Sequence, residues 1–122
     1  MLQAIPAKIF RAHLSEGDKY DGKSLSEAIV TKCRDMNIAG ATIFRGLEGY
    51  GETAEIHKHH LLARDRPIIV VVIDTPQNIE RLKPVVEGMI DTGMIIVSDV
   101  EMIRVEKSGA MQASNQSSLP EK

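Results

Sequence analysis

A chain of 122 residues is long enough for one domain with a buried core and too short for two. With 43% hydrophobic and 26% charged residues, its composition is that of a globular protein and argues against a fibrous or wholly disordered chain. The net charge of −2 and the lack of Trp argue against nucleic acid as a partner, because phosphates attract cations and bases stack on aromatic rings.

Cys33 is the single cysteine, so the chain can form neither an internal disulfide nor a multi-thiolate metal site, which fits a reducing compartment. No apolar run approaches the roughly 20 residues that span a bilayer, and Met1–Lys8 does not resemble a secretion signal. We therefore expect a cytoplasmic protein that does not insert into a membrane. The polar segment 108–122 is expected to be a disordered tail after a domain formed by residues 1–107.

The first half of the domain predicts a strand, a helix and a second strand. Apolar and polar residues alternate over Lys8–Leu14, as in a half-buried strand. Ser24 and Glu27 have the spacing of a capping box, which predicts a helix whose apolar stripe includes Cys33 as a core residue. Further along the chain, Ala41–Arg45 is typical of a strand.

The second half begins with an unbroken run of β-branched residues, Ile68–Ile73, which predicts a strand buried on both faces. Thr75 followed by Pro76 is typical of a helix N-terminus, and Asp91–Gly93 is expected to end that helix. Residues 94–97 and 100–105 predict one long or two short closing strands.

This order of elements is β-α-β, a long polar loop, and β-α-β. With two right-handed crossovers it predicts an α+β, ferredoxin-like double split βαβ fold, in which an antiparallel sheet carries two helices on one face. Because the helices cover one face only, the apolar strands predict a second layer on the other face, contributed by another copy of the chain. We therefore expect a homo-oligomer.

Residues 17–24 match the phosphate-loop pattern G-x-x-x-x-G-K-[ST] between a predicted strand and a predicted helix. The apolar strand that ends at Asp74 would supply the carboxylate that holds Mg²⁺ in such enzymes. The chain is short for the parallel sheet that this chemistry uses, so a polar turn before a helix is the simpler interpretation. Lys19 and Lys23 could still hold an anion at the start of the helix without hydrolysing it.

His57, His59 and His60 are close enough in sequence to suggest a transition-metal site. Zinc sites normally take further ligands from a second element, which no cysteine pair supplies here, so we predict no metal. The sequence shows no nucleophile beside a base and no local pair of carboxylates with opposed surroundings. We therefore assign no catalytic residue and expect a protein that is not an enzyme.

Several short motifs resemble one known family, and the resemblance extends from about Lys8 to Val105. The motifs are Glu16–Lys19, Gly22–Lys23, Gly40–Gly51 and Ile56–His57. Together they are similar to the family called domain of unknown function 190, whose members look like nitrogen-regulatory PII signal-transduction proteins. The Arg-Gly-x-x-Gly-Tyr-Gly segment that begins at Arg45 is the most specific part.

The resemblance implies a ferredoxin-like trimer in which a loop corresponding to residues 46–66 projects outward. PII relatives bind adenine nucleotides in clefts between subunits, and the loop reports occupancy to a partner, often a membrane transporter or an enzyme. For this chain the resemblance implies ATP, ADP or AMP as a ligand and no required cofactor. Glycine amides and a guanidinium group suit phosphate. The residues implied for binding are Lys19, Lys23, Arg45, Gly46, Gly49, Tyr50 and Gly51.

Three functions are compatible with the sequence. The first is a PII-like sensor that binds an adenine nucleotide or a similar anionic small molecule and signals through the loop 46–66 to a partner protein. The second is a small nucleotide-hydrolysing or metal-dependent enzyme that uses residues 17–24 or the histidine cluster. The third is an assembly module that docks a partner through the loop without a ligand.

Overall fold

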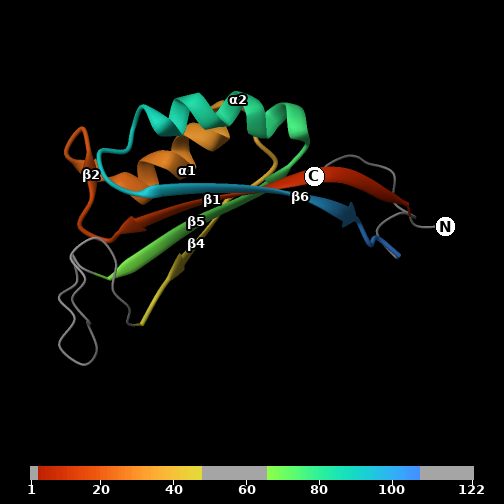
Figure 1. Ribbon diagram of the computed structural model, residues 1–122, viewed down its shortest axis with the longest axis horizontal. Helices are drawn as coiled ribbons and strands as arrows, with labels where there is room; N and C mark the ends of the chain where they lie inside the picture. Colours follow the sequence, from red (N-terminus) through yellow and green to blue (C-terminus); the bar gives the residue numbers. More distant parts are fainter. Residues whose placement is uncertain (1–2, 48–65, 108–122) are drawn as a thin grey trace.

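The computed structural model describes residues 3–47 and 66–107 (Figure 1). Its antiparallel sheet has the strand order β4-β5-β1-β6, and the strands are β1 (Ala4–Ser15), β4 (Thr42–Arg45), β5 (Pro67–Asp74) and β6 (Met94–Ile103). The helices α1 (Leu25–Asp35) and α2 (Pro76–Glu87) both lie on one face of the sheet (Figure 1). This arrangement is the ferredoxin-like double split βαβ fold, and it confirms the predicted α+β class.

The register between β1 and β5 decides which side chains face the helices. Phe10 lies opposite Val72 and Ala12 lies opposite Val70, and all four side chains are buried. Opposite residues of antiparallel strands share a face, so these residues form the floor of the core under the helices. The remaining buried residues of this core are Leu14, Leu25, Ile29, Cys33, Ile38, Ile79, Leu82, Val86 and Met89. Cys33 is thus a core residue, as the helical stripe predicted.

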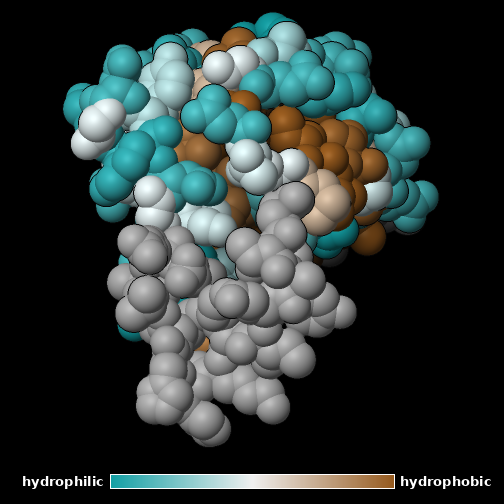
Figure 2. Space-filling view, turned by 60° about the vertical axis from the view of Figure 1, so that its left-hand side comes forward, coloured by the Kyte–Doolittle hydropathy of each residue, from teal (hydrophilic) through white to brown (hydrophobic). Residues whose placement is uncertain are grey.

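The opposite face of the sheet has no helix among the described residues. Ile69, Val71 and Ile73 of β5 alternate with buried residues; the first two are half-buried and Ile73 is exposed. Figure 2 shows a continuous patch of hydrophobic residues at the surface, beside a largely hydrophilic region. One chain therefore buries β5 on a single face, and the predicted second layer is not supplied by the residues described.

α2 begins as predicted and ends earlier than predicted. The side-chain oxygen of Thr75 accepts a hydrogen bond from the backbone N–H of Asn78 at 3.1 Å, and proline is the first helical residue. The helix ends at Glu87, with Gly88 as its C-cap, and not at Asp91–Gly93. Glycine exposes the backbone and has low helix propensity, which favours an end at this point.

α1 begins where predicted, but the predicted capping box is wrong. The side chain of Ser24 makes no hydrogen bond to the helix backbone, and its hydroxyl lies 3.1 Å from that of Ser26. A short hairpin of β2 (Lys19–Tyr20) and β3 (Lys23–Ser24) leads into the helix. Since Ser24 belongs to a strand pair, its side chain is not in position to cap the helix.

β6 is one strand from Met94 to Ile103, which decides between the one or two closing strands expected. No helix in the described part of the chain is long and apolar enough to cross a membrane. The predicted tail 108–122 and most of the predicted loop, residues 48–65, lie outside the described residues.

Candidate functional site

The two ends of the predicted loop meet beside the end of β1. Arg45 is the last residue of β4, and the N–H of Gly46 donates a hydrogen bond to the carbonyl of Pro67 at 2.8 Å. Glu16 directly follows β1, and its N–H donates to the carbonyl of Arg66 at 2.8 Å. We call these five residues the loop base. Two backbone hydrogen bonds therefore fix the points at which the chain leaves and re-enters the sheet.

Glu16 also holds both arginines of the loop base. Its Oε1 accepts a hydrogen bond from Nε of Arg45 and its Oε2 accepts one from Nη2, each at 3.1 Å. Nη1 of Arg66 lies 3.6 Å from the same Oε1. Two guanidinium groups share one carboxylate, so the cluster carries excess positive charge and can attract an anion.

Gly46 is required at the loop base for a steric reason. A Cβ atom at this position would lie 2.6 Å from Cγ of Pro67, closer than two carbon atoms that are not bonded to each other can approach. The absence of a side chain thus allows the close backbone pairing of the two loop ends. The N–H of Gly46 is engaged in this pairing, so its contribution to the site is to shape the backbone.

Residues 17–24 form a hairpin and not a phosphate loop. The two residues between β2 and β3 are Asp21 and Gly22, with φ of 53° and 76°. Positive φ at both positions is typical of a type I′ turn, for which Asp-Gly is a preferred sequence. The sheet beside the hairpin is antiparallel, so this segment does not have the parallel strand, loop and helix of phosphate-loop enzymes.

The hairpin places the two predicted lysines on opposite faces. Lys19 pairs with Ser24 and Lys23 pairs with Tyr20, and opposite residues share a face. Lys23 lines a cavity of about 290 Å³ against α1. The other lining residues are a mixture of charged, polar and apolar types: Tyr20, Asp21, Glu27, Ala28, Thr31, Lys32, Asp35 and Met89. Among the described residues, the ion pairs of Glu16 are with Arg45 and Arg66, and neither lysine takes part in them. The structure therefore does not place the lysines in the ion-pair cluster of the loop base.

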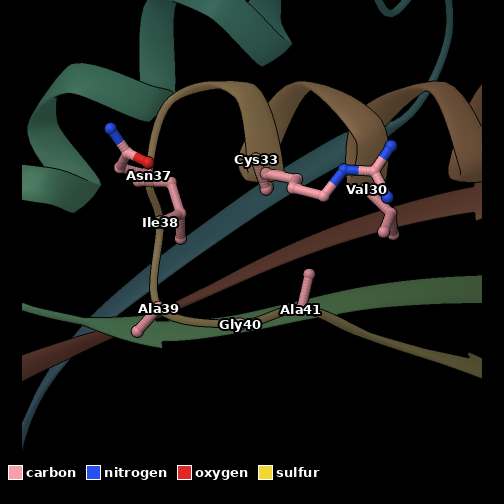
Figure 3. Close-up of a pocket in the computed structure, with 8 residues that line it drawn as sticks. Val30, Cys33, Asn37, Ile38, Ala39, Gly40 and Ala41 are labelled. Atoms are coloured by element: carbon pink, nitrogen blue, oxygen red, sulfur yellow. The ribbon is translucent and has the colours of Figure 1, made fainter. Parts of the chain in front are cut away.

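A larger cavity of about 360 Å³ lies between α1 and the segment that leads into β4 (Figure 3). It exists because Asn37, which follows the C-cap Met36 and has φ of 61°, turns the chain back beneath the helix. The lining residues are Val30, Cys33, Arg34, Asn37, Ile38, Ala39, Gly40 and Ala41. None of the residues predicted to bind a ligand is among them. Burial raises the pKa of the Cys33 thiol from 9.0 to about 11, so this thiol is not an activated nucleophile.

Asp74 is occupied by structural hydrogen bonds. Its carboxylate, in a residue that is 7% exposed, accepts from the N–H of Ala39 at 2.9 Å, the N–H of Thr75 at 2.6 Å and Nδ2 of Asn78 at 3.1 Å. These donors compensate the buried charge. The residue considered from the sequence as a Mg²⁺ ligand instead joins the start of α2 to the segment after α1.

The other sequence-predicted residues cannot be placed. Gly49, Tyr50 and Gly51, together with the histidine cluster of His57, His59 and His60, lie outside the described residues. Within the described part of the chain, no group of three His, Cys, Asp or Glu side chains is arranged to hold a metal ion.

Sequence reasoning did not select Glu16 and Arg66 as site residues. Each directly borders a strand, Glu16 after β1 and Arg66 before β5. Because Ser15 pairs with Pro67, the antiparallel register places these two neighbours side by side. The sequence shows an acidic residue after one apolar strand and an arginine before another. This pattern predicts an ion pair only when the pairing of the two strands is known.

Comparison with protein families finds one match that covers most of the chain. Residues 7–102 match the domain of unknown function 190 (DUF190), which is described as "Uncharacterized ACR". A UPF0166 protein of Aquifex aeolicus is 33% identical over 104 residues, which cover 84% of this chain and 98% of the relative. A UPF0166 protein of Methanocaldococcus jannaschii is 33% identical over 105 residues, covering 84% of this chain and 96% of the relative.

Solved structures share the fold at low sequence identity. CPII, a nitrogen regulatory PII-like protein from Thiomonas intermedia, bound to ADP, AMP and bicarbonate, has a TM-score of 0.61 and 20% identity, covering 85% of this chain and 94% of its own. A protein described as PII-like from Thermus thermophilus has a TM-score of 0.58 and 14% identity, covering 89% of this chain and 97% of its own. At these identities the likeness establishes the PII-like fold.

Proposed function

Since the chain belongs to the domain of unknown function 190 family and has a PII-like fold, we propose that it is a PII-like regulatory protein and not an enzyme. It binds an adenine nucleotide or a similar anionic small molecule at clefts between subunits. The segment 46–66 passes the state of the site to a partner protein, such as a transporter or an enzyme. Nucleotide binding is supported by the ADP and AMP of CPII, which shares the fold.

The proposal rests mainly on the arrangement of charges at the loop base. Arg45 and Arg66 come from the two ends of the segment 46–66 and converge on Glu16. Arginine binds phosphate through two parallel N–H donors, so a guanidinium pair at this place suits an anionic ligand. A ligand bound here touches both ends of the segment that would report it.

A homo-oligomer, most simply a trimer, is part of the proposal. The helix-free face of the sheet exposes Phe44, Ile73 and Met94, which are 54%, 44% and 53% exposed. The strand register places Phe44 and Met94 in one row across this face. Burial of these side chains against another copy would be favourable at about 25 cal/mol for each Å² removed from water.

The experiment that tests the function is isothermal titration of the purified protein with ATP, ADP and AMP, with and without Mg²⁺, followed by a phosphate-release assay on the same samples. We expect saturable binding without release. Arg45→Gln should weaken binding by roughly tenfold or more, because it removes charge-assisted hydrogen bonds to the ligand. Arg104→Gln is the control, because it removes an exposed arginine beyond the end of β6. Phosphate release would support an enzyme, and absence of binding would support an assembly module.

A further inference from the structure

Glu16 engages Arg45 in the way that an anionic ligand would. Both carboxylate oxygens face one edge of the guanidinium, with Oε1 at 3.1 Å from Nε and Oε2 at 3.1 Å from Nη2. Arginine binds phosphate and carboxylate groups with the same pair of parallel donors. The edge of Arg45 best suited to a ligand is therefore occupied by a side chain of the protein itself.

Solvent exposure makes this contact replaceable. The side chain of Glu16 is 25% exposed and those of Arg45 and Arg66 are 55% and 41% exposed. Ion pairs that water reaches contribute little to stability, because water and dissolved ions compete for both partners. A phosphate carries more charge than a carboxylate and offers more acceptor oxygens, so it can take the place of Glu16 between the two arginines.

We propose that Glu16 is an internal competitor for the anion that Arg45 and Arg66 bind. Without ligand, Glu16 occupies the guanidinium edge; a ligand with a terminal phosphate or carboxylate group displaces it. This inference rests on the proposed function, because it takes the loop base to be the anion site. It adds that the affinity of the loop base for the anion depends on Glu16 as well as on the two arginines.

Displacement of Glu16 changes the contacts of three segments at once. The carboxylate comes from the end of β1, while the arginines come from the end of β4 and the start of β5. The backbone hydrogen bonds from Gly46 to Pro67 and from Glu16 to Arg66 do not involve these side chains. The exchange therefore alters side-chain contacts at both ends of the segment 46–66 without requiring the sheet to open.

The test compares Glu16→Gln and Glu16→Asp with the wild-type protein in titrations with ADP, inorganic phosphate and adenosine. Glutamine removes the charge, and aspartate keeps the charge but is too short to engage both donors in the same position. We expect both variants to bind ADP or phosphate about twofold to fivefold more tightly. Adenosine affinity should not change. If the affinity for phosphate increases as much as the affinity for ADP, the phosphate group alone competes with Glu16. If only the affinity for ADP increases, the whole nucleotide is needed to displace Glu16.

Glu80→Gln is the matched control. It removes the same charge from an exposed ion pair with Lys83 on α2, at 3.3 Å, and should bind like the wild type. Hydrogen exchange at the Gly46 amide reports whether the loop base stays paired in each variant. Unchanged or weaker ADP binding by folded Glu16 variants, with intact wild-type binding, would overturn the competition and make Glu16 a positioning residue. Absence of binding in every protein would overturn the proposed function itself.

Discussion

The backbone N–H of Ala39 donates a hydrogen bond of 2.9 Å to the buried carboxylate of Asp74, across 35 positions of the sequence. This contact ties the segment that follows α1 to the end of β5, where α2 begins. The carboxylate accepts two further hydrogen bonds, from Thr75 and Asn78. It therefore organises the end of the sheet opposite to the loop base.

Asp74→Ala should lower the free energy of unfolding by about 1.5–3 kcal/mol, because hydrogen bonds to a charged group are lost and their part-buried donors keep no acceptor at this position. Urea denaturation measures the change. Asp91→Ala, at an exposed position, is the control and should change stability by less than about 0.5 kcal/mol. A loss of similar size in both variants would argue against the role of Asp74.

Alanine substitution should change the stability differently at Ser24, which precedes α1, and at Thr75, which precedes α2. Thr75→Ala removes an observed N-cap hydrogen bond and should cost about 1 kcal/mol. Ser24→Ala should be close to neutral, because Ser24 makes no capping bond. Equal losses for the two variants in urea denaturation would show that Ser24 caps α1 in solution.

Gly46→Ala should disrupt the loop base. The added Cβ would lie 2.6 Å from Cγ of Pro67, so the strands must separate, at a cost of about 1–3 kcal/mol. Gly40→Ala is the matched control, because nothing lies within 4 Å of its added Cβ. Thermal denaturation measures the stability, and faster hydrogen exchange at the Glu16 amide would locate the damage. Equal effects of the two substitutions would contradict this account.

Ile73→Asp should dissociate the proposed oligomer without unfolding the chain. Ile73 is 44% exposed on the helix-free face and lies opposite Ile9, so a single chain tolerates the charge better than an interface does. Light scattering after size-exclusion chromatography measures the mass. Val105→Asp, at a residue 59% exposed after β6, should keep the wild-type mass. A monomeric wild type, or an unchanged mass for Ile73→Asp, would contradict the proposed interface.

The stability of the protein should fall as the pH rises through the range in which Cys33 titrates. Burial raises the pKa of this thiol from 9.0 to about 11, so the folded state keeps its proton while the unfolded state loses it. The unfolded state then binds fewer protons between these two values, and the free energy of unfolding decreases with pH. In Cys33→Ala, urea denaturation at a series of pH values should show a shallower decrease. Identical slopes would show that the thiol does not contribute.

Hydrophobic periodicity was sufficient to predict β1 and the two helices of the core, whereas β5 was predicted from its unbroken run of β-branched residues. Phe10, Ala12 and Leu14 alternate in β1, and Ile79, Leu82 and Val86 recur at helical spacing in α2. Burial of one face imposes these two periods on any chain, so they can be read without a structure. The same reasoning identified Cys33 as a core residue. Short capping motifs predicted side-chain contacts less reliably, since Ser24 has the spacing of a capping box with Glu27 but pairs with Lys19 in a hairpin.

The candidate site was only partly accessible to the same reasoning. The sequence and its family resemblance drew attention to Arg45 and Gly46, while Glu16 and Arg66 gained their meaning from the pairing of β1 with β5. A charged residue beside a strand carries no information about which other strand end it will meet. Strand order and register decide that, because they bring residues distant in sequence within reach of one hydrogen bond. The amino-acid pattern thus determined which segments are buried, and the tertiary structure decided which charges share a carboxylate.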